Sequence, residues 1–199
     1  PSYVLPHLLF PVADLTKPEV RAHARKLGLV TAEKPESQEI CFVPTGDYGE
    51  FLAKRVGAQH PSLTPGALVS ASGETLGEHA GYARYTVGQR RGLGGGFGKP
   101  LYVLGVRPST NEVVVGTEDE LYRDDEEVGD LNWLEKPPDP GDALLVQLRY
   151  RADAVLCTIE QVGTEEVQLK LHSPQRAVTP GQSGVLYRDA VVVGGGRIR

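Results

Sequence analysis

From Pro61 to its end, the chain is a succession of short apolar runs separated by glycine, proline and small polar residues. Runs of this length, rich in Val, Leu and Tyr and bounded by turn residues, are typical of β-strands. This punctuation leaves little room for long helices and predicts a mainly β protein. The expected strands are 67–69, 82–87, 101–106, 113–115, 130–134, 143–150, 155–161, 167–171, 183–187 and 190–194.

The last five of these runs follow one another closely, with turns expected at Gly163-Thr164 and Pro180-Gly181. Many short strands over such a short stretch favour a small closed or nearly closed barrel. Ser72-Gly73 and residues 109–111 are expected hairpin turns in an earlier β-rich module. Cys157 lies within an apolar alternation and is expected in the barrel core. We therefore expect three parts: residues 1–45, a central β-rich domain over 46–125, and a C-terminal β-barrel over 126–199.

Two short helices are expected before the strands, which makes the fold class mainly β with short helices (α+β). In the first, Thr16 is the N-cap, Glu19 completes a capping box and Gly28 provides the stop. The second is expected to begin at Asp47 and to end by Gly57.

The net charge of −5 is unevenly distributed. Residues 118–142 carry eleven Asp and Glu against two Lys and Arg, a local net charge of −9, whereas residues 46–117 and 143–199 each carry a net charge of +2. We expect the acidic stretch to be a passage between modules, with Trp133 as a packing anchor. Because screening in physiological salt acts over about 8 Å, local charge governs contact with RNA more than the total does.

The two cysteines are far apart in the sequence and form no zinc-binding pair. Cys41 lies between apolar neighbours and is followed by a Pro-Thr-Gly-Asp turn. On residue type alone, a lone cysteine in an apolar run is more often a small buried hydrophobe than a nucleophile. The five histidines have no metal-binding spacing, so no metal site is expected.

Residues 81–99 form a glycine-rich loop that also contains four cations and two tyrosines. A Walker loop would need glycine at Leu93, and a dinucleotide fingerprint would need glycine or alanine at Phe97, so neither nucleotide motif is present. The loop's cations and tyrosines fit contact with an RNA backbone and unstacked bases; they are Arg84, Arg90, Arg91 and Lys99, with Tyr82 and Tyr85 between them. A flexible hairpin with solvated arginines fits this composition equally well.

Two further stretches in the last module suit contacts with phosphate or sugar. Residues 147–151 alternate polar and apolar side chains, which would project Arg149 and Arg151 from one face of a strand. A Pro-Gly turn at 180–181 would present Gln182. Both stretches can equally be ordinary barrel surface.

Several motifs, in this order, together resemble the tRNA-specific 2-thiouridylases over the whole chain. They are Leu-Phe-Pro-Val at 9–12, Thr-Lys-Pro-Glu-Val-Arg at 16–21, Ser-Gln-Glu-Ile-Cys-Phe at 37–42, the stretch 85–94, Arg-Tyr-Arg at 149–151 and Ala-Val-Thr-Pro-Gly-Gln at 177–182. The resemblance covers about the C-terminal half of that family. It implies that residues 1–45 are a remnant of an α/β PP-loop domain that carries the catalytic-cysteine loop.

In that family an N-terminal PP-loop domain uses ATP and Mg²⁺ to adenylate the C2 oxygen of the wobble uridine in tRNA. The resemblance implies that Cys41 carries the persulfide that donates the sulfur, while Cys157 stays structural. It implies tRNA contacts for Arg149, Tyr150 and Gln182, with Gln89 and Arg90 as weaker candidates. The implied partners are tRNA, a sulfur-donor relay protein and the PP-loop domain.

The PP-loop signature Ser-Gly-Gly-x-Asp-Ser does not occur in this sequence. We therefore expect the ATP site to lie in a missing N-terminal half, without which the chain is inactive. The alternative is a stand-alone RNA-binding β module without catalysis. No apolar run approaches the roughly 18 residues that a membrane span needs. We expect a cytoplasmic protein that does not enter a membrane.

Overall fold

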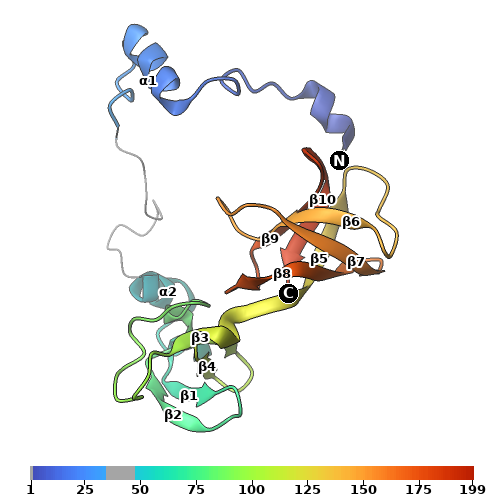
Figure 1. The fold of residues 1–199 in the computed structure, drawn as a ribbon. Helices are drawn as coiled ribbons and strands as arrows, with labels where there is room; N and C mark the ends of the chain where they lie inside the picture. The colour runs from blue at the N-terminus through green and yellow to red at the C-terminus, as the bar shows by residue number, and fades with distance from the viewer. Residues whose placement is uncertain (1, 35–47) are drawn as a thin grey trace. The chain divides into compact units, whose positions relative to one another are not determined.

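The computed structural model describes residues 2–34 and 48–199 (Figure 1). The chain divides into two compact units, residues 1–48 and 49–199. No helix in the described ranges is long and apolar enough to cross a membrane. The expected fold class is confirmed, because most regular structure is strand and the helices are short.

The first unit contains a 3₁₀ helix, η1 (Ser2–His7), and the helix α1 (Lys17–Lys26). The predicted capping box of α1 is confirmed: the backbone N–H and the hydroxyl of Thr16 both donate to Glu19 Oε2, at 2.7 and 2.6 Å. Gly28 ends the helical stretch with φ of 66°, and its N–H donates to the Arg25 carbonyl. None of the α1 residues is buried.

The second unit begins within the helix α2 (Tyr48–Val56), at Gly49, and a 3₁₀ helix, η2 (Pro61–Leu63), follows. The start predicted at Asp47 lies outside the described residues. A four-stranded sheet follows, in the order β2-β1-β4-β3. Its strands are β1 (Gly66–Ser70), β2 (Thr75–His79), β3 (Tyr102–Arg107) and β4 (Glu112–Gly116).

In this sheet, β1 and β4 pair in parallel and the other neighbours are antiparallel. Its core consists of Leu68, Leu93, Leu101, Val103, Val113 and Val115.

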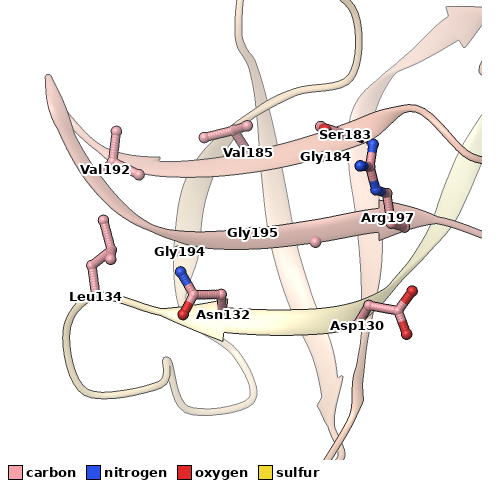
Figure 2. A pocket seen from close by; sticks show the side chains of 11 residues that line it. Asp130, Asn132, Leu134, Ser183, Gly184, Val185, Val192, Gly194, Gly195 and Arg197 are labelled. Carbon is pink, nitrogen blue, oxygen red and sulfur yellow. Dashed lines mark hydrogen bonds between the residues drawn. The ribbon is translucent and has the colours of Figure 1, made fainter. Parts of the chain in front are cut away.

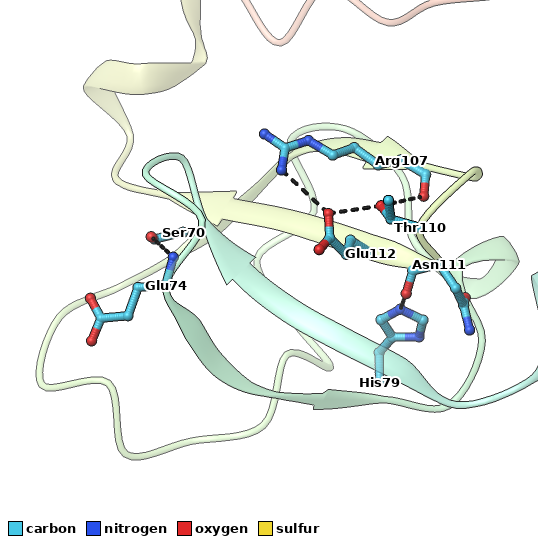
Figure 3. Close-up of polar contacts among 7 residues, drawn as sticks. All are labelled: Ser70, Glu74, His79, Arg107, Thr110, Asn111 and Glu112. Atoms are coloured by element: carbon cyan, nitrogen blue, oxygen red, sulfur yellow. Dashed lines mark hydrogen bonds and ion pairs between the residues drawn. The ribbon is translucent and has the colours of Figure 1, made fainter.

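The predicted turn at 109–111 joins β3 to β4 and is fixed by polar contacts (Figure 3). Glu112 Oε2 accepts from Arg107 at 3.3 Å and from Thr110 Oγ1 at 2.8 Å. The buried His79 ring accepts from the Gly81 N–H at Nδ1, so its Nε2 carries the proton and donates to the Asn111 carbonyl at 3.1 Å. His79 is therefore a hydrogen-bonded core residue.

The strand predicted at 82–87 is wrong, because Tyr82–Arg84 forms a 3₁₀ helix, η3, and residues 85–87 are not strand. The preceding Gly81 has φ of 109°, and a Cβ there would lie 2.7 Å from the Leu63 Cα. This glycine turns the chain sharply against η2. The N–H groups of Arg84 and Tyr85 then bond back to Gly81 and Tyr82 instead of a neighbouring strand.

A closed six-stranded barrel follows the 3₁₀ helix η4 (Asp119–Leu121), in the order β10-β5-β8-β7-β6-β9. The predicted barrel is thus confirmed. Closure leaves no sheet edge unpaired, which suits a small domain. Its strands are β5 (Tyr122–Trp133), β6 (Ala143–Gln147), β7 (Val155–Val162), β8 (Glu166–Arg176), β9 (Ser183–Arg188) and β10 (Val191–Ile198).

The barrel interior is filled by alternating apolar side chains from all six strands. Trp133 packs against this core, as predicted, and a Cβ at Gly194 would collide with its ring. The buried residues are Val128, Leu144, Val146, Leu148, Cys157, Ile159, Val167, Leu169, Leu171, Leu186, Val193 and Ile198.

The acidic stretch is not a passage between modules: Asp124–Glu127 lies inside β5, which begins at Tyr122. The domain boundary predicted after residue 125 therefore falls within a barrel strand. Most of these carboxylates face solvent, but Glu126 shares the inward face of β5 with Val128 and is 4% exposed. A strand can contain this acidic run because successive side chains point alternately to the inner and the outer face of the barrel.

Candidate nucleic-acid interface

A groove of about 500 Å³ on the barrel brings together Arg149, Tyr150 and Gln182. Strand pairing explains their meeting: β6 pairs with β9 so that Gln147 lies opposite Val185. The residues that follow β6 therefore lie beside those that precede β9. The groove is lined by Gln147, Arg149, Tyr150, Gly181, Gln182, Ser183, Val185 and Arg197.

Arg149 is held by carbonyl oxygens rather than by carboxylates. Its Nη2 donates to the Ala177 carbonyl at 2.7 Å and to the Arg176 carbonyl at 3.2 Å. The side chain of Leu148 is buried in the barrel and anchors the loop from the other side. The guanidinium is thus fixed at the groove and keeps its charge available for an anion.

Tyr150 is 84% exposed, and the Arg151 guanidinium lies 5.3 Å from the centre of its ring. Our expectation that Arg149 and Arg151 project from one face of a strand is wrong, because β6 ends at Gln147. The Gln147 amide ends the strand by donating to the Ala152 carbonyl at 2.8 Å, and Arg151 adopts φ of 63°. The resulting turn leaves the tyrosine ring in solvent, where a base can stack on it.

Gln182 is presented by the Pro-Gly turn predicted from the sequence. Gly181 has φ of 87°, and the Gln182 N–H donates to the Thr179 carbonyl at 3.2 Å. The turn is tied to the end of β10, since Gly181 donates to the Ile198 carbonyl and Ile198 donates to that of Gln182. Its backbone is therefore fixed, while the Gln182 side chain is exposed.

Gln89 and Arg90 do not line this groove. The Gln89 amide stabilises its own loop: its oxygen accepts from the Thr86 N–H at 3.1 Å, and its nitrogen donates to the Arg91 carbonyl at 2.8 Å. Arg90 is exposed. The structure thus unites three of the five predicted tRNA contacts and leaves these two in another loop.

Several arginines in and beside the groove have no carboxylate partner, whereas most other cations of the barrel outside it, with Arg123 as an exception among the described residues, are paired. Elsewhere, Lys170, Arg176, Arg188 and Arg199 form ion pairs with carboxylates at distances from 2.8 to 4.0 Å. In the described part of the chain, Arg149, Arg151 and Arg197 have no such pair, and no acidic residue lines the groove. Among the described residues the groove therefore carries positive charge without a compensating carboxylate, on a protein with a net charge of −5.

Sequence reasoning missed Arg197 and Ser183 as groove residues. The available signal was the alternation Arg197-Ile198-Arg199 at the end of the last strand, which places both arginines on the outer face. The sequence alone does not tell which of these two arginines lacks a carboxylate partner, because the nearby acidic residues come from other strands. Arg199 meets Asp130 at 3.2 Å, whereas Arg197 does not meet a carboxylate of the described chain.

Cys41 lies outside the described residues, so its assignment stays a prediction. Cys157 is fully buried in the barrel core. Desolvation raises the pKa of its thiol to about 11, although a hydrogen bond with the Leu144 backbone acts in the opposite direction. A thiol in this setting is not a nucleophile at neutral pH.

We expect Cys157 to resist alkylation in the native protein, because both burial and its raised pKa suppress the reactive thiolate. Iodoacetamide at pH 8 should leave the peptide that contains Cys157 unmodified, and should modify both cysteines of the sequence in denaturant. Peptide mass spectrometry gives the extent at each site. Equal rates of modification of Cys157 in native and denatured protein would contradict the burial argument.

Three family models match consecutive parts of the chain: the "tRNA methyl transferase HUP domain" over residues 1–45, the "tRNA methyl transferase PRC-barrel domain" over 49–117, and the "Aminomethyltransferase beta-barrel domain" over 123–198. The tRNA-specific 2-thiouridylase MnmA of Carboxydothermus hydrogenoformans is 46% identical over 197 residues, which cover 98% of this chain and 53% of that relative.

The MnmA proteins of Koribacter versatilis and Symbiobacterium thermophilum are 46% and 44% identical, each over 198 residues. Each match covers 98% of this chain, and 53% and 49% of the relatives' own lengths. The chain thus spans about half the length of the curated relatives it matches. With all three models in order and this identity over almost every residue, the chain belongs to the family of tRNA-specific 2-thiouridylases.

Proposed function

We propose that this chain provides the RNA-docking surface and the sulfur-carrying cysteine of a tRNA 2-thiouridylase. The observation that carries the proposal is the groove in which Arg149, Tyr150 and Gln182 meet, although Gln182 comes 32 positions after Tyr150 in the sequence. Arginines without a carboxylate partner in the described chain, an exposed aromatic ring and an exposed amide are the groups that RNA recognition uses.

In the proposed reaction, Cys41 carries a persulfide whose terminal sulfur attacks C2 of the wobble uridine. A C–S bond forms there as the activated oxygen substituent leaves, and a second thiol then takes Cys41 into a disulfide and releases the sulfur to the tRNA. Cys157 does not fit the role of that second thiol, because it is sealed in the barrel. The second thiol is therefore assigned to no residue of this sequence.

The family's ATP and Mg²⁺ do not fit the residues described here. The sequence lacks the PP-loop signature, and residues 2–34 and 48–199 contain no cluster of His, Cys, Asp and Glu that could hold a metal ion. We therefore assign no residue of this chain to adenylation. The proposal includes tRNA and a sulfur-donor relay protein as partners and the cytoplasm as the location.

The second candidate function is RNA binding without catalysis. The same groove favours it, because phosphate and base contacts require no reactive group. The two candidates share the docking surface and differ only in the sulfur chemistry of Cys41.

Replacing Arg149 with alanine is expected to weaken tRNA binding about tenfold at low salt and to lower the slope of log affinity against log salt by about 1, because one phosphate contact is lost. Fluorescence anisotropy with a labelled tRNA over a salt series measures both quantities. Arg188→Ala is the matched control, since it removes the same charge from a barrel arginine that pairs with Glu135 away from the groove. Equal affinity of the Arg149 variant and the wild type would contradict the docking assignment.

A further inference from the structure

Arg197 lies at the end of β10 and contacts both neighbours of Gln182. Its Nη1 donates to the Gly181 carbonyl and to Ser183 Oγ, each at 3.3 Å. The position follows from strand pairing, because Arg197 lies opposite Ser183 in the β9–β10 ladder. Arg197 is thus fixed beside the turn that presents Gln182.

The bonds to Gly181 and Ser183 use only one nitrogen of the guanidinium. A guanidinium has five N–H donors, so those on Nε and Nη2 stay available. Within the described chain they meet no acceptor and no carboxylate. Arg149 faces the same groove and is likewise held by carbonyl oxygens alone. Two fixed and unneutralised guanidiniums around one groove are suited to a phosphate, which they can bind with charge-assisted hydrogen bonds.

A second depression of about 400 Å³ adjoins the groove and shares Ser183, Val185 and Arg197 with it. Figure 2 shows Arg197 beside Ser183 of β9, with Gly194 and Gly195 on the same strand as Arg197, β10. These glycines let β10 pack closely against Trp133 and the backbones of β9 and β5, because a Cβ at any of them would collide there. Arg197 therefore lies where the two depressions meet. At this position it can contact a bound strand that runs from one depression into the other.

We propose that Arg197 binds a backbone phosphate of an unpaired RNA segment, next to a base that stacks on Tyr150 in the same groove. The strand would continue from the groove past Arg197 into the second depression. This inference rests on the proposed tRNA function and deepens it, since it adds a residue to the docking surface and specifies single-stranded rather than duplex RNA. The exposed Tyr150 ring favours the unpaired form, because bases inside a duplex offer no face for stacking.

The test uses the whole 199-residue chain and a labelled anticodon stem–loop RNA in a salt series. Arg197→Ala is expected to weaken binding about fivefold to tenfold and to lower the salt slope by about 1, as for the loss of one phosphate contact. Arg197→Lys should keep most of the salt slope, because the charge stays. Arg188→Ala is again the charge-matched control and should change the affinity less than about twofold.

The outcomes separate the two proposals. If the wild type binds and Arg149→Ala weakens binding but Arg197→Ala does not, the Arg197 inference is overturned and the docking function stands. If the wild type does not bind RNA at any salt concentration, both fall. If an RNA duplex competes as well as a single strand with the same number of phosphates, the stacked base is wrong. Fluorescence of the single Trp133 confirms that each variant keeps the barrel.

Discussion

A Cys41→Ser variant is expected to lose at least about a thousandfold of 2-thiouridine formation, whereas its tRNA affinity should stay within about twofold of wild type. Serine has nearly the same shape as cysteine but cannot carry a persulfide, so only the sulfur transfer step is lost. The substitution leaves Arg149, Tyr150 and Gln182 of the groove unchanged. The variant should therefore lose 2-thiouridine formation while its tRNA affinity stays nearly unchanged.

Thiolation can be measured only with a protein that completes the whole reaction. Residues 1–199 are joined to the part of the Carboxydothermus hydrogenoformans relative that this chain does not match, and the chimera is given tRNA, ATP, Mg²⁺ and a sulfur donor. Gel electrophoresis with an organomercurial retards thiolated tRNA and quantifies the product. A persulfide on Cys41 is measured independently by trapping and peptide mass spectrometry of the 199-residue chain.

Cys157→Ala is the matched control, because it removes the other cysteine of the sequence from the barrel core. It is expected to cost some stability but to leave thiolation intact. Full thiolation by the Cys41→Ser chimera, or a persulfide found on Cys157 instead, would reject the sulfur-carrier role and favour RNA binding without catalysis.

Much of the fold can be predicted from the sequence, because residues close together in the chain determine its helix cap, its turns and most of its strands. The capping box of Thr16 and Glu19, the turn at 109–111 and most of the strands are determined by residues adjacent in the chain. Strand β2 was not predicted, since Thr75–His79 has no apolar alternation and is held by pairing with β1. Residues 82–87 look like a strand, but the constrained backbone at Gly81 prevents it.

The site is less readable than the fold, because long-range pairing assembles it. Arg149 and Gln182 were each identifiable in the sequence, but their meeting depends on the β6–β9 ladder. Arg197 joins them only through the β9–β10 register. Its availability further depends on having no carboxylate nearby among the described residues, whereas the neighbouring Arg199 pairs with Asp130. Neither condition can be read from adjacent residues.

Glu126→Gln is expected to stabilise the protein at pH 8 by up to about 3 kcal/mol and to have little effect near pH 4.5. Glu126 is 4% exposed inside the barrel, and its Oε1 has no hydrogen-bond partner in the described chain. Burial raises the pKa of this carboxyl from an ordinary 4.5 to about 7, with the Arg123 charge opposing the shift and the Asp125 charge adding to it.

The direction of the pH dependence follows from the raised pKa. Between pH 4.5 and about 7 the folded protein holds a proton on Glu126 that the unfolded chain has released. The free energy of unfolding therefore falls as pH rises through this window. Glutamine is always neutral and nearly the same shape, so the variant should lack this component of the decrease.

Urea unfolding followed by Trp133 fluorescence at several pH values between 4.5 and 8 measures the effect, because this tryptophan packs against the barrel core. Glu165→Gln serves as the matched control: it makes the same change at an exposed position of the same barrel and should alter the free energy of unfolding by less than about 0.5 kcal/mol. If Glu126→Gln and wild type lose stability in parallel from pH 4.5 to 8, the carboxylate is charged without cost in the fold. The inward position of Glu126 would then be wrong.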